Sequence, residues 1–598
     1  MNQNNSQKSA SALHLGSDIF CKALVDAGMD AMFGIPGGVV LPLYDKLNQY
    51  GHKIRHILPR QEQGGGFAAD GYARATGKVG VSLGTSGPGA TNLMTSIANS
   101  MMDSVPTVYI TGQVVEEFIG TDAFQETDVI GMTMPIVKHS YLVNKAKEIP
   151  RIVKEAFHLA STGRPGPVHI DLVKDVWFQE EPYDENPTMD LPGYNPIPEK
   201  CTDRDIQKFD AILERDGIRP VIIAGHGVEI SRAQKELVAF AEKHNIPVVS
   251  TLLGMGNFPQ GHKNWIGMIG MHGDAVANYA IHNSNLIIGI GCRFDDRITG
   301  KLDTFIKGKT FVHIEIDPSE IGKIVPTELP LPGDIKEVLT RANSLLENHK
   351  TLYTNWWSQI TEWKKEYGFL DFTINKEARP GFLSQPRIVD MLSRITNGEA
   401  IVAGDVGRNQ MWLSRFYRFK HPNSHLSSGG LGSMGYGVPS SMGAKVGCPE
   451  REVWSISGDG GFMMNVQELA TLAEYKIPVK MCIMEDGVLG MVRQWQNLLF
   501  KGNISHSEFK NPDFVKLSEA FGIPAWRAST YEEAEAAIHA ARKVDGPTLI
   551  TFMVDPEEHV YPMVPPNTAL GDQALCDADL LKDKSHKYKQ DDLLQGHT

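Results

Sequence analysis

The sequence lacks several features that mark whole classes of protein. Its six cysteines are scattered and include no CxxC pair, which indicates reduced thiols of a cytosolic protein. No apolar stretch reaches the roughly 18 residues that a membrane-spanning helix needs. The polar start MNQNNSQKSASALHLGS has neither a signal-peptide apolar core nor an Arg-rich transit pattern. We therefore expect a cytoplasmic protein that has no membrane partner.

Positive charge is also scarce. The 598 residues include 58 Lys and Arg against 71 Asp and Glu, which gives a formal net charge of −13. No basic cluster interrupts this excess of acid, so we expect no nucleic-acid partner. The overall field does not attract anions, so an anionic ligand requires a local arginine, a metal ion or a helix N-terminus to hold it.

Short apolar runs recur at helix-sized intervals along the chain. Examples are GVSLGTS and PVHIDL in the first third, PVIIAG and NLIIGIG in the middle, and EVWSIS and VKMCIM in the last third. Such runs predict parallel strands that helices bury on both faces. The predicted fold class is α/β, with three doubly wound parallel-sheet domains. The first and last thirds share their strand spacing, which indicates a duplicated architecture.

Two Pro-rich segments divide the chain into domains. The first, QEEPYDENPTMDLPGYNPIPEK, is also acidic, and the second joins a Trp-rich helical stretch to ARPGFLSQP. The predicted parts are a flexible N-terminus at 1–12, a first domain at 13–185, a linker at 186–200, a central domain at 201–348, a second linker at 349–385, a third domain at 386–566 and a C-terminal tail at 567–598.

Two carboxylates stand at the predicted ends of neighbouring strands in the last third. In EVWSISGDGGFMMNVQELATLAEYKIPVKMCIMED, Asp459 follows one strand and Asp486 follows the next. A right-handed βαβ unit places both at the carboxyl edge of the sheet, where open α/β sheets bind ligands. Two carboxylates and a nearby carbonyl suit Mg²⁺ shared with a diphosphate. The alternative is that Gly-Asp-Gly forms only a tight turn and Glu485-Asp486 only a solvated loop.

Gly-Asp-Gly followed by a helix, a strand and a polar pair resembles the thiamine diphosphate (ThDP) motif of the ThDP-dependent decarboxylases. RQEQGGGF, GTSGPGATNL, GRPGPVHIDLVKD, GCRFDDRITGKL, HIEIDPSEIGK and SSGGLGSMGYGVP extend this resemblance to the acetohydroxyacid synthases, from Leu13 to Pro566. The family pattern ends in Asn-Asn where this chain has Glu485-Asp486. The resemblance implies domains that bind, in order, the pyrimidine of ThDP, FAD, and the diphosphate with Mg²⁺.

The resemblance also implies which residues hold ThDP and its metal. Glu62 would exchange a proton with the aminopyrimidine ring, and Met434 would hold the cofactor in a bent shape. Asp459 and Asp486 would bind Mg²⁺ through their side chains, and Val488 through its carbonyl. The other implied ThDP contacts are Pro36, Gly37, Thr85, Asn92, Gly432, Gly458, Gly460, Gly461, Leu489 and Met491.

The implied FAD site lies mainly in the central domain. Acids at the end of FVHIEID suit a ribose, and glycine loops after strands suit a dinucleotide, although no GxGxxG occurs there. In this family the flavin has a structural role. The implied FAD residues are Arg164, Gly225, Gly227, Thr251, Leu252, Gly270, Met271, His272, Gly291, Arg293, Asp295, Arg297, Glu315, Ile316, Asp334 and Ile335.

The implied substrates are pyruvate and a second 2-oxoacid, either pyruvate or 2-oxobutyrate. Arg297 would hold the carboxylate of the second 2-oxoacid, and Phe124, Gln125 and Lys138 would line the entrance. Trp495 would narrow the acceptor pocket, where one methylene is worth roughly 1–3 kcal/mol. The products would be 2-acetolactate or 2-aceto-2-hydroxybutyrate, in branched-chain amino acid biosynthesis. The alternative for each residue is a surface ion pair or a core aromatic.

The resemblance implies a homodimer or homotetramer in which Glu62 of one subunit meets the Asp459 site of another, together with a small regulatory subunit. Other ThDP carboligases and pyruvate oxidase share several of the motifs and remain alternatives. A further alternative is a non-catalytic paralogue that acts as an assembly partner, in which Glu485-Asp486 has spoiled the cofactor site.

Overall fold

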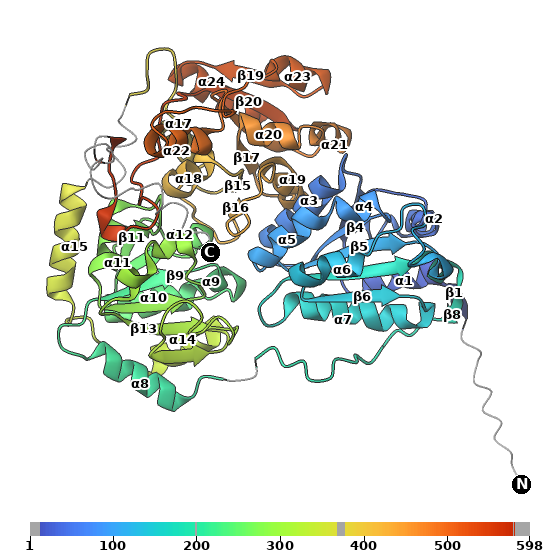
Figure 1. The fold of residues 1–598 in the computed structure, drawn as a ribbon, viewed down its shortest axis with the longest axis horizontal. Helices are drawn as coiled ribbons and strands as arrows, with labels where there is room; N and C mark the ends of the chain where they lie inside the picture. Colours follow the sequence, from blue (N-terminus) through green and yellow to red (C-terminus); the bar gives the residue numbers. More distant parts are fainter. Residues whose placement is uncertain (1–11, 198–199, 368–376, 578, 580–598) are drawn as a thin grey trace, which may run out of the picture. The chain divides into compact units, whose positions relative to one another are not determined.

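The computed structural model describes residues 12–197, 200–367, 377–577 and 579 (Figure 1). The chain forms two compact units: unit 1 takes residues 1–194 and 442–447, and unit 2 takes residues 195–441 and 448–598. Residues 1–11 of the predicted N-terminal segment and 580–598 of the predicted tail lie outside the described residues.

Unit 1 is built around one six-stranded sheet. Its strands are β2 (Ala31–Gly34), β3 (Arg55–Ile57), β4 (Gly80–Gly84), β5 (Thr107–Gln113), β6 (His139–Val143) and β7 (Pro167–Val173), in the order β3-β2-β4-β5-β7-β6. All neighbouring strands in this sheet are parallel. The main helices are α1 (Gly16–Asp26), α2 (Leu41–Tyr50), α3 (Glu62–Thr76), α5 (Met94–Met102) and α7 (Ile149–Ser161). A short antiparallel pair, β1 (Leu13–Leu15) with β8 (Glu180–Pro182), joins the two ends of the unit.

Alternate residues of β5 pack on opposite faces of this sheet. Val108 and Ile110 belong to the core that includes α1, α2 and α7, whereas Tyr109 packs with Leu93 and Ile97 on the other side. Because helices cover both faces, all of β5 is buried. This burial explains why the strand has no alternation of apolar and charged residues, as the sequence predicts for a parallel sheet.

A group of polar side chains interrupts the apolar sheet. Asp171 on β7 accepts hydrogen bonds from Thr111 Oγ1 (2.7 Å) and Gln113 Nε2 (3.2 Å) on β5, and a ring nitrogen of His169 lies 2.7 Å from Thr111 Oγ1. Burial raises the pKa of Asp171 to about 7, against the effect of its two hydrogen bonds, and lowers the pKa of His169 to about 3. Both shifts favour the uncharged form of the group.

We expect Asp171→Asn to remove a pH-dependent part of the stability of unit 1. The pKa of Asp171 rises from 3.8 to about 7 on folding, so its contribution is complete below pH 3.8 and is lost as the pH rises through about 7. Relative to the parent, the variant should gain about 2–3 kcal/mol between pH 5 and pH 8, at about 1.36 kcal/mol per pKa unit. Thermal unfolding of both proteins across this range measures the gain.

The matched control is Asp45→Asn, at an exposed residue of α2 in the same unit. The lowered pKa of His169 affects the parent and the variant alike, so it cancels in their difference. A stability difference between parent and Asp171→Asn that is the same at every pH would contradict the prediction.

Unit 2 begins with a second parallel six-stranded sheet. Its strands are β9 (Pro220–Ala224), β10 (Val248–Ser250), β11 (Trp265–Met268), β12 (Leu286–Ile290), β13 (Thr310–Glu315) and β14 (Leu329–Pro332), in the order β11-β10-β9-β12-β13-β14. The helices include α8 (Asp203–Leu213), α10 (Gln234–His244), α11 (Ala275–Asn283), α14 (Ile335–Leu345) and α15 (Thr354–Glu366). The first part of the predicted linker at 349–385 forms α15, whose Trp356 and Ile360 are buried in the core of this unit.

The order of the second sheet is typical of dinucleotide-binding folds. Numbered along the chain, its strands run 3-2-1-4-5-6, and the direction of winding reverses between β9 and β12. Ligands of open α/β sheets bind at such a switch point, outside the carboxyl ends of the strands.

The third sheet is also parallel and six-stranded. Its strands are β15 (Ile401–Gly404), β16 (His425–Ser427), β17 (Val453–Gly458), β18 (Val479–Glu485), β19 (Ala525–Ala528) and β20 (Thr548–Met553), in the order β16-β15-β17-β18-β20-β19. Its helices include α17 (Gln385–Ile395), α18 (Arg408–Phe416), α19 (Gly437–Gly447), α20 (Asp459–Met464), α21 (Glu468–Glu474), α22 (Gly490–Leu499), α23 (Phe514–Ala520) and α24 (Tyr531–Lys543). Numbered along the chain, the first and third sheets both run 2-1-3-4-6-5, which confirms the predicted duplication.

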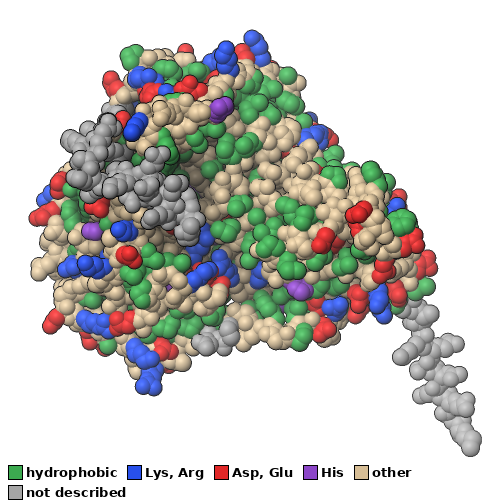
Figure 2. All heavy atoms as spheres, in the orientation of Figure 1, with side chains coloured by type: hydrophobic (Ala, Val, Ile, Leu, Met, Phe, Trp, Pro, Cys, Tyr) green, Lys and Arg blue, Asp and Glu red, His purple; other side chains and the backbone are tan. Residues whose placement is uncertain are grey.

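The predicted fold class, with three doubly wound parallel sheets, is confirmed. The six cysteines are free thiols. Within the described part of the chain, no helix combines the length and the apolarity that crossing a membrane requires. Lys and Arg side chains are interspersed with Asp and Glu over the face drawn in Figure 2.

Candidate functional site

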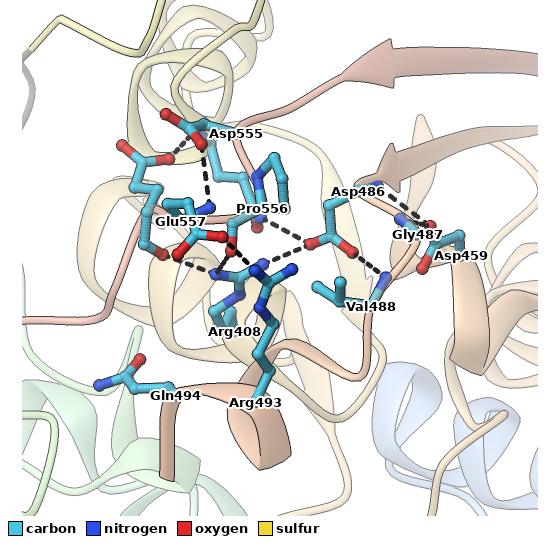
Figure 3. Close-up of polar contacts among 12 residues, drawn as sticks. Arg408, Asp459, Asp486, Gly487, Val488, Arg493, Gln494, Asp555, Pro556 and Glu557 are labelled. Atoms are coloured by element: carbon cyan, nitrogen blue, oxygen red, sulfur yellow. Dashed lines mark hydrogen bonds and ion pairs between the residues drawn. The ribbon is translucent and has the colours of Figure 1, made fainter. Parts of the chain in front are cut away.

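Asp459 and Asp486 meet at the carboxyl edge of the third sheet (Figure 3). The strands β17 and β18 are parallel and place Gly458 opposite Met484, so both acids follow strand ends at the same level. The backbone N–H of Asp486 donates to Asp459 Oδ2 over 3.0 Å. The prediction that the two residues lie together is confirmed.

Asp459, the first residue of α20, is oriented by several donors. Its Oδ2 accepts hydrogen bonds from the N–H groups of Asp486 and Gly487 (2.6 Å) and from Asn511 Nδ2 (2.7 Å). Its Oδ1 accepts the N–H of Gly460 at 2.8 Å. Burial raises the pKa of Asp459, and these hydrogen bonds oppose the rise. The carboxylate is therefore held in place by the protein itself.

Asp486 forms a buried ion pair with Arg408, the first residue of α18. Asp486 Oδ2 accepts Arg408 Nη2 at 2.6 Å, and Asp486 Oδ1 accepts the N–H of Val488 at 3.0 Å. The two charged side chains are only 2% and 7% exposed. Burial raises the pKa of Asp486 to about 6, while the Arg408 charge lowers it. Reasoning from the sequence missed Arg408, because no motif signals a partner so far away in the chain.

Glu485 points to the neighbouring strands. Its Oε2 accepts a hydrogen bond from Thr551 Oγ1 on β20 (2.7 Å) and lies 3.8 Å from Arg527 Nη2 on β19. Glu485 therefore joins β18 to the next two strands, whereas the Asp486 side chain pairs with Arg408 and the Asp486 backbone N–H donates to Asp459.

Unpartnered polar atoms surround the two carboxylates. Asn511 Oδ1, Gln385 Oε1 and Arg408 Nε are buried and have no hydrogen-bond partner among the described residues. Buried polar atoms are usually paired, so such a cluster is typical of a site that binds a polar ligand. The oxygen donors of Asp459 and Asp486 are of the type that Mg²⁺ prefers. The residues present fit Mg²⁺ bound together with a diphosphate.

Asp405, at the end of β15, anchors the loop that contains Met434. Its carboxylate accepts the N–H groups of Gly435 (3.0 Å) and Gly437 (3.1 Å), and burial raises its pKa to about 6. A Cβ added to Gly461 would lie 2.8 Å from Asp405 Oδ1. Asp405 therefore joins the Met434 loop to the glycines beside Asp459, at the switch point between β15 and β17. It too was missed from the sequence.

The other predicted diphosphate-side residues follow the same strand ends. Gly458 ends β17, and Gly460 and Gly461 lie in the first turn of α20. A Cβ on Gly460 would lie 3.1 Å from the Leu489 side chain, so this glycine allows α22 to approach. Gly432, another predicted ThDP residue, has a φ of 72°, and Met491 lies on α22 together with Trp495, the predicted acceptor-pocket residue.

In unit 1, a second group of predicted residues gathers around Glu62, the first residue of α3. Asn92 Nδ2 donates to Glu62 Oε2 at 2.9 Å, and a Cβ on Gly89 would lie 3.4 Å from Glu62 Oε1. A Cβ on Gly37 would lie 2.4 Å from the Thr85 side chain. Thr85 Oγ1 is buried without a hydrogen-bond partner in the described structure, which fits a polar ligand.

These residues lie at the switch point of the first sheet. Pro36 and Gly37 follow β2, and Thr85 follows β4, the two strands between which the winding reverses. The first and third sheets therefore place predicted ThDP residues at equivalent points of the same topology.

The predicted entrance residues are placed differently from one another. Phe124 is 89% exposed. A Cβ added to Gly87 would lie 2.9 Å from the carbonyl oxygen of Gln125. Lys138 Nζ donates to the carbonyls of Leu159 and Thr162, the latter at 2.8 Å, at the end of α7. Phe124 and Gln125 therefore lie beside the glycine turn after β4, while Lys138 is bound to a helix end.

The predicted FAD residues of the central sheet lie around the switch point between β9 and β12. Gly225 and Gly227 follow β9, and a Cβ on Gly227 would lie 2.7 Å from Gly291 Cα, after β12. His272 is 5% exposed, neither of its ring nitrogens has a hydrogen-bond partner in the described chain, and burial lowers its pKa to about 3. The glycine cradle at the switch point, and the uncharged histidine in the loop after the edge strand β11, lie beyond the carboxyl ends of the strands, where dinucleotides bind.

The other predicted FAD residues of unit 2 occupy loops at the same edge. Thr251 and Leu252 follow β10, Gly270 and Met271 follow β11, Arg293 and Asp295 follow β12, Glu315 ends β13 before Ile316, and Asp334 and Ile335 follow β14. Arg297 is 62% exposed at its side chain and lies 3.7 Å from the Asp296 carboxylate. Arg164 belongs to unit 1, where its Nε donates to Ser104 Oγ at 2.9 Å.

Three family models match the chain in succession. The thiamine pyrophosphate (ThDP) enzyme N-terminal TPP binding domain matches residues 15–132, the central domain matches residues 211–342, and the C-terminal TPP binding domain matches residues 405–552. The last match includes both Asp459 and Asp486.

Curated relatives match nearly the whole chain. The acetolactate synthase large subunit of Corynebacterium glutamicum is 46% identical over 558 residues, which cover 92% of this chain and 88% of the relative. The probable acetolactate synthase large subunit of Methanocaldococcus jannaschii is 45% identical over 93% of this chain and 94% of its own length. The acetolactate synthase of Mycobacterium bovis is 44% identical over 93% and 90%. The chain therefore belongs to the acetolactate synthase large-subunit family of ThDP-dependent enzymes.

Proposed function

We propose that this protein decarboxylates pyruvate and joins the remaining two-carbon unit to a second pyruvate or to 2-oxobutyrate. The products are 2-acetolactate and 2-aceto-2-hydroxybutyrate, intermediates of branched-chain amino acid biosynthesis in the cytoplasm. The observation that carries this proposal is the pair of buried carboxylates, Asp459 and Asp486, inside the match to the C-terminal TPP binding domain. Bound ThDP supplies the carbanion chemistry of the reaction.

The residues of this chain bind and orient the reacting groups. Asp459, Asp486 and the Val488 carbonyl would hold Mg²⁺, whose positive charge would help to bind the diphosphate. Met434 supports the cofactor ring on a loop that Asp405 anchors. Glu62 exchanges a proton with the aminopyrimidine ring, and the hydrogen bond from Asn92 limits the orientations of its carboxylate.

Substrate recognition needs a local positive charge because the chain as a whole is acidic. We assign this role to Arg297, whose exposed guanidinium is available to a 2-oxoacid carboxylate. Trp495 on α22 narrows the acceptor pocket. FAD binds beyond the carboxyl ends of the central sheet, where the glycine cradle at the switch point and His272 after β11 support it, and has a structural role.

The active unit is a homodimer at least, with a small regulatory subunit as a further partner. Large apolar side chains are exposed beside both groups of candidate residues: Phe124 (89%) in unit 1, and Met464 (54%), Leu431 (43%) and Met463 (39%) in unit 2. Exposed apolar side chains beside a site are typical of an interface. Several relatives are named large subunits, which supports a small partner subunit.

The proposed function predicts a specific product. Purified protein supplied with ThDP, Mg²⁺, FAD and pyruvate should form 2-acetolactate, and added 2-oxobutyrate should divert the product to 2-aceto-2-hydroxybutyrate. Flavin absorbance is recorded in the same reaction, because a pyruvate oxidase would bleach the flavin and a carboligase would not. A folded protein with bound FAD that forms neither product would contradict the proposal and favour the non-catalytic paralogue.

A further inference from the structure

Negative charge is concentrated at the candidate metal site. Asp459 and Asp486 are both buried in one small site, and the ligand expected there is an anionic diphosphate. Like charges repel strongly where water is excluded. At Asp486 the pattern of the resembling family has Asn, which has no charge. Two carboxylates would cancel the double charge of Mg²⁺ and leave none to attract the diphosphate, so a further positive charge close to Asp486 favours binding of this anion.

Arg408 is a buried cation in direct contact with that carboxylate. Its Nη2 donates to Asp486 Oδ2 at 2.6 Å, and its Nη1 donates to the carbonyls of Pro556 and Glu558, both at 2.9 Å (Figure 3). A Cβ on Gly490 would lie 2.1 Å from Arg408 Nε, so the start of α22 packs directly on the guanidinium. These contacts fix Arg408 in one position.

The neighbouring Arg493 is paired with other acids. Its Nη1 lies 3.1 Å from Glu508 Oε1, and its Nη2 pairs with Glu557. Arg493 is a residue of α22 with the same charge as Arg408, and it provides a matched comparison.

We propose that Arg408 is a positioning residue of the cofactor site: it neutralises Asp486, so that Asp459, Asp486 and Arg408 together have the formal charge of a single carboxylate. Asp486 can then act as an oxygen ligand of Mg²⁺ without repelling the diphosphate. The inference rests on the proposed function, because it requires Mg²⁺ and ThDP to bind at Asp459 and Asp486. It also accounts for an acidic residue where the family pattern has a neutral one.

The two single variants should impair different ligands. Arg408→Gln leaves Asp486 uncompensated, so at saturating Mg²⁺ its affinity for ThDP should fall about 10- to 100-fold, while its affinity for Mg²⁺ is retained or increased. Asp486→Asn removes an anionic ligand and leaves the Arg408 charge uncompensated, so its affinity for Mg²⁺ should fall about 10- to 100-fold. Calorimetric titration of each ligand in the presence of the other measures both affinities.

The double variant Arg408→Gln/Asp486→Asn restores the formal charge. Its affinities for ThDP and Mg²⁺ should both return to within about threefold of the parent, because coupled neighbours are not additive. Arg493→Gln should leave both affinities within about threefold, since its partners are Glu508 and Glu557. If Arg408→Gln does not fold, Arg408→Lys, which keeps the positive charge, tests whether that charge maintains the affinity for ThDP.

The outcomes separate this inference from the proposed function. If both single variants lose both affinities in parallel and the double variant does not recover, Arg408 has only a structural role and the inference is wrong. If the parent binds ThDP with Mg²⁺ and Arg408→Gln binds them equally well, the inference is also wrong while the proposed function stands. If the parent itself does not bind ThDP with Mg²⁺, the proposed function fails.

Discussion

Replacement of Glu62 by Gln is expected to slow product formation about 10²- to 10⁴-fold, the usual contribution of a positioned acid or base. The amide cannot exchange a proton with the aminopyrimidine ring. Its oxygen can still accept the hydrogen bond that Asn92 Nδ2 now donates to Glu62 Oε2 at 2.9 Å, so the side chain should keep its orientation. The loss would therefore report on the proton itself.

Exchange of the C2 proton of bound ThDP with deuterated solvent is the direct measurement, followed by NMR after acid quenching. Asn92→Ala is the matched control, since it removes the orienting donor and leaves the acid, and it should cost only about tenfold through lost orientation. Unchanged C2 exchange in Glu62→Gln would remove Glu62 from its proposed role.

Asp459→Asn is expected to weaken the binding of Mg²⁺ and ThDP about 100-fold, the upper end of losses at metal sites. This substitution is usually mild because Asn has nearly the shape of Asp. Here Oδ2 accepts three N–H donors and Oδ1 accepts a fourth, from Gly460. Whichever way the new amide turns, its NH₂ group meets at least one of these donors, so the site must open.

Calorimetric titration of ThDP in the presence of Mg²⁺ measures this loss, and thermal unfolding without ligands shows whether the fold survives. Asp513→Asn is the matched control: Asp513 is the N-cap of α23, two residues after Asn511, and Asn caps helices as well as Asp does. Wild-type affinity in Asp459→Asn would contradict the role of Asp459 as a metal ligand.

Most interior strands of the three sheets could be predicted from the sequence, and the edge strands could not; the interior strand β15 (Ile401–Gly404) is the exception that the predicted runs did not include. Continuous apolar runs mark β5, β12 and β18, which helices cover on both faces. The strands β3, β6, β11, β14, β16 and β19 lie at sheet edges and have no such run in the predictions. Edge strands have one neighbour and are often partly exposed, as in RHI of β3 and AWRA of β19, so apolarity does not mark them.

The residues of the candidate site also differ in whether the sequence predicts them. Asp459 and Asp486 were predictable because strand ends in a parallel sheet share one edge, a rule that needs only local sequence. Arg408 lies 78 residues before Asp486, and its contact depends on how α18 packs beside the sheet. Glu485 and Asp486 are adjacent in sequence, yet their side chains contact different neighbours, because Glu485 is the last residue of β18 and contacts β20, whereas Asp486 begins the following loop and pairs with Arg408.

The first and third sheets have the same strand order but hold different functional side chains at equivalent positions. The same strand order places a hydroxyl and an acid near the switch point of the first sheet, and a pair of carboxylates with a buried arginine near that of the third. The Asp486–Arg408 ion pair is formed among residues of the third sheet, and the Glu62–Asn92 hydrogen bond among residues of the first. The negative charge at position 486 is therefore balanced by one arginine within the third sheet, a pairing to which the residues around Glu62 do not contribute.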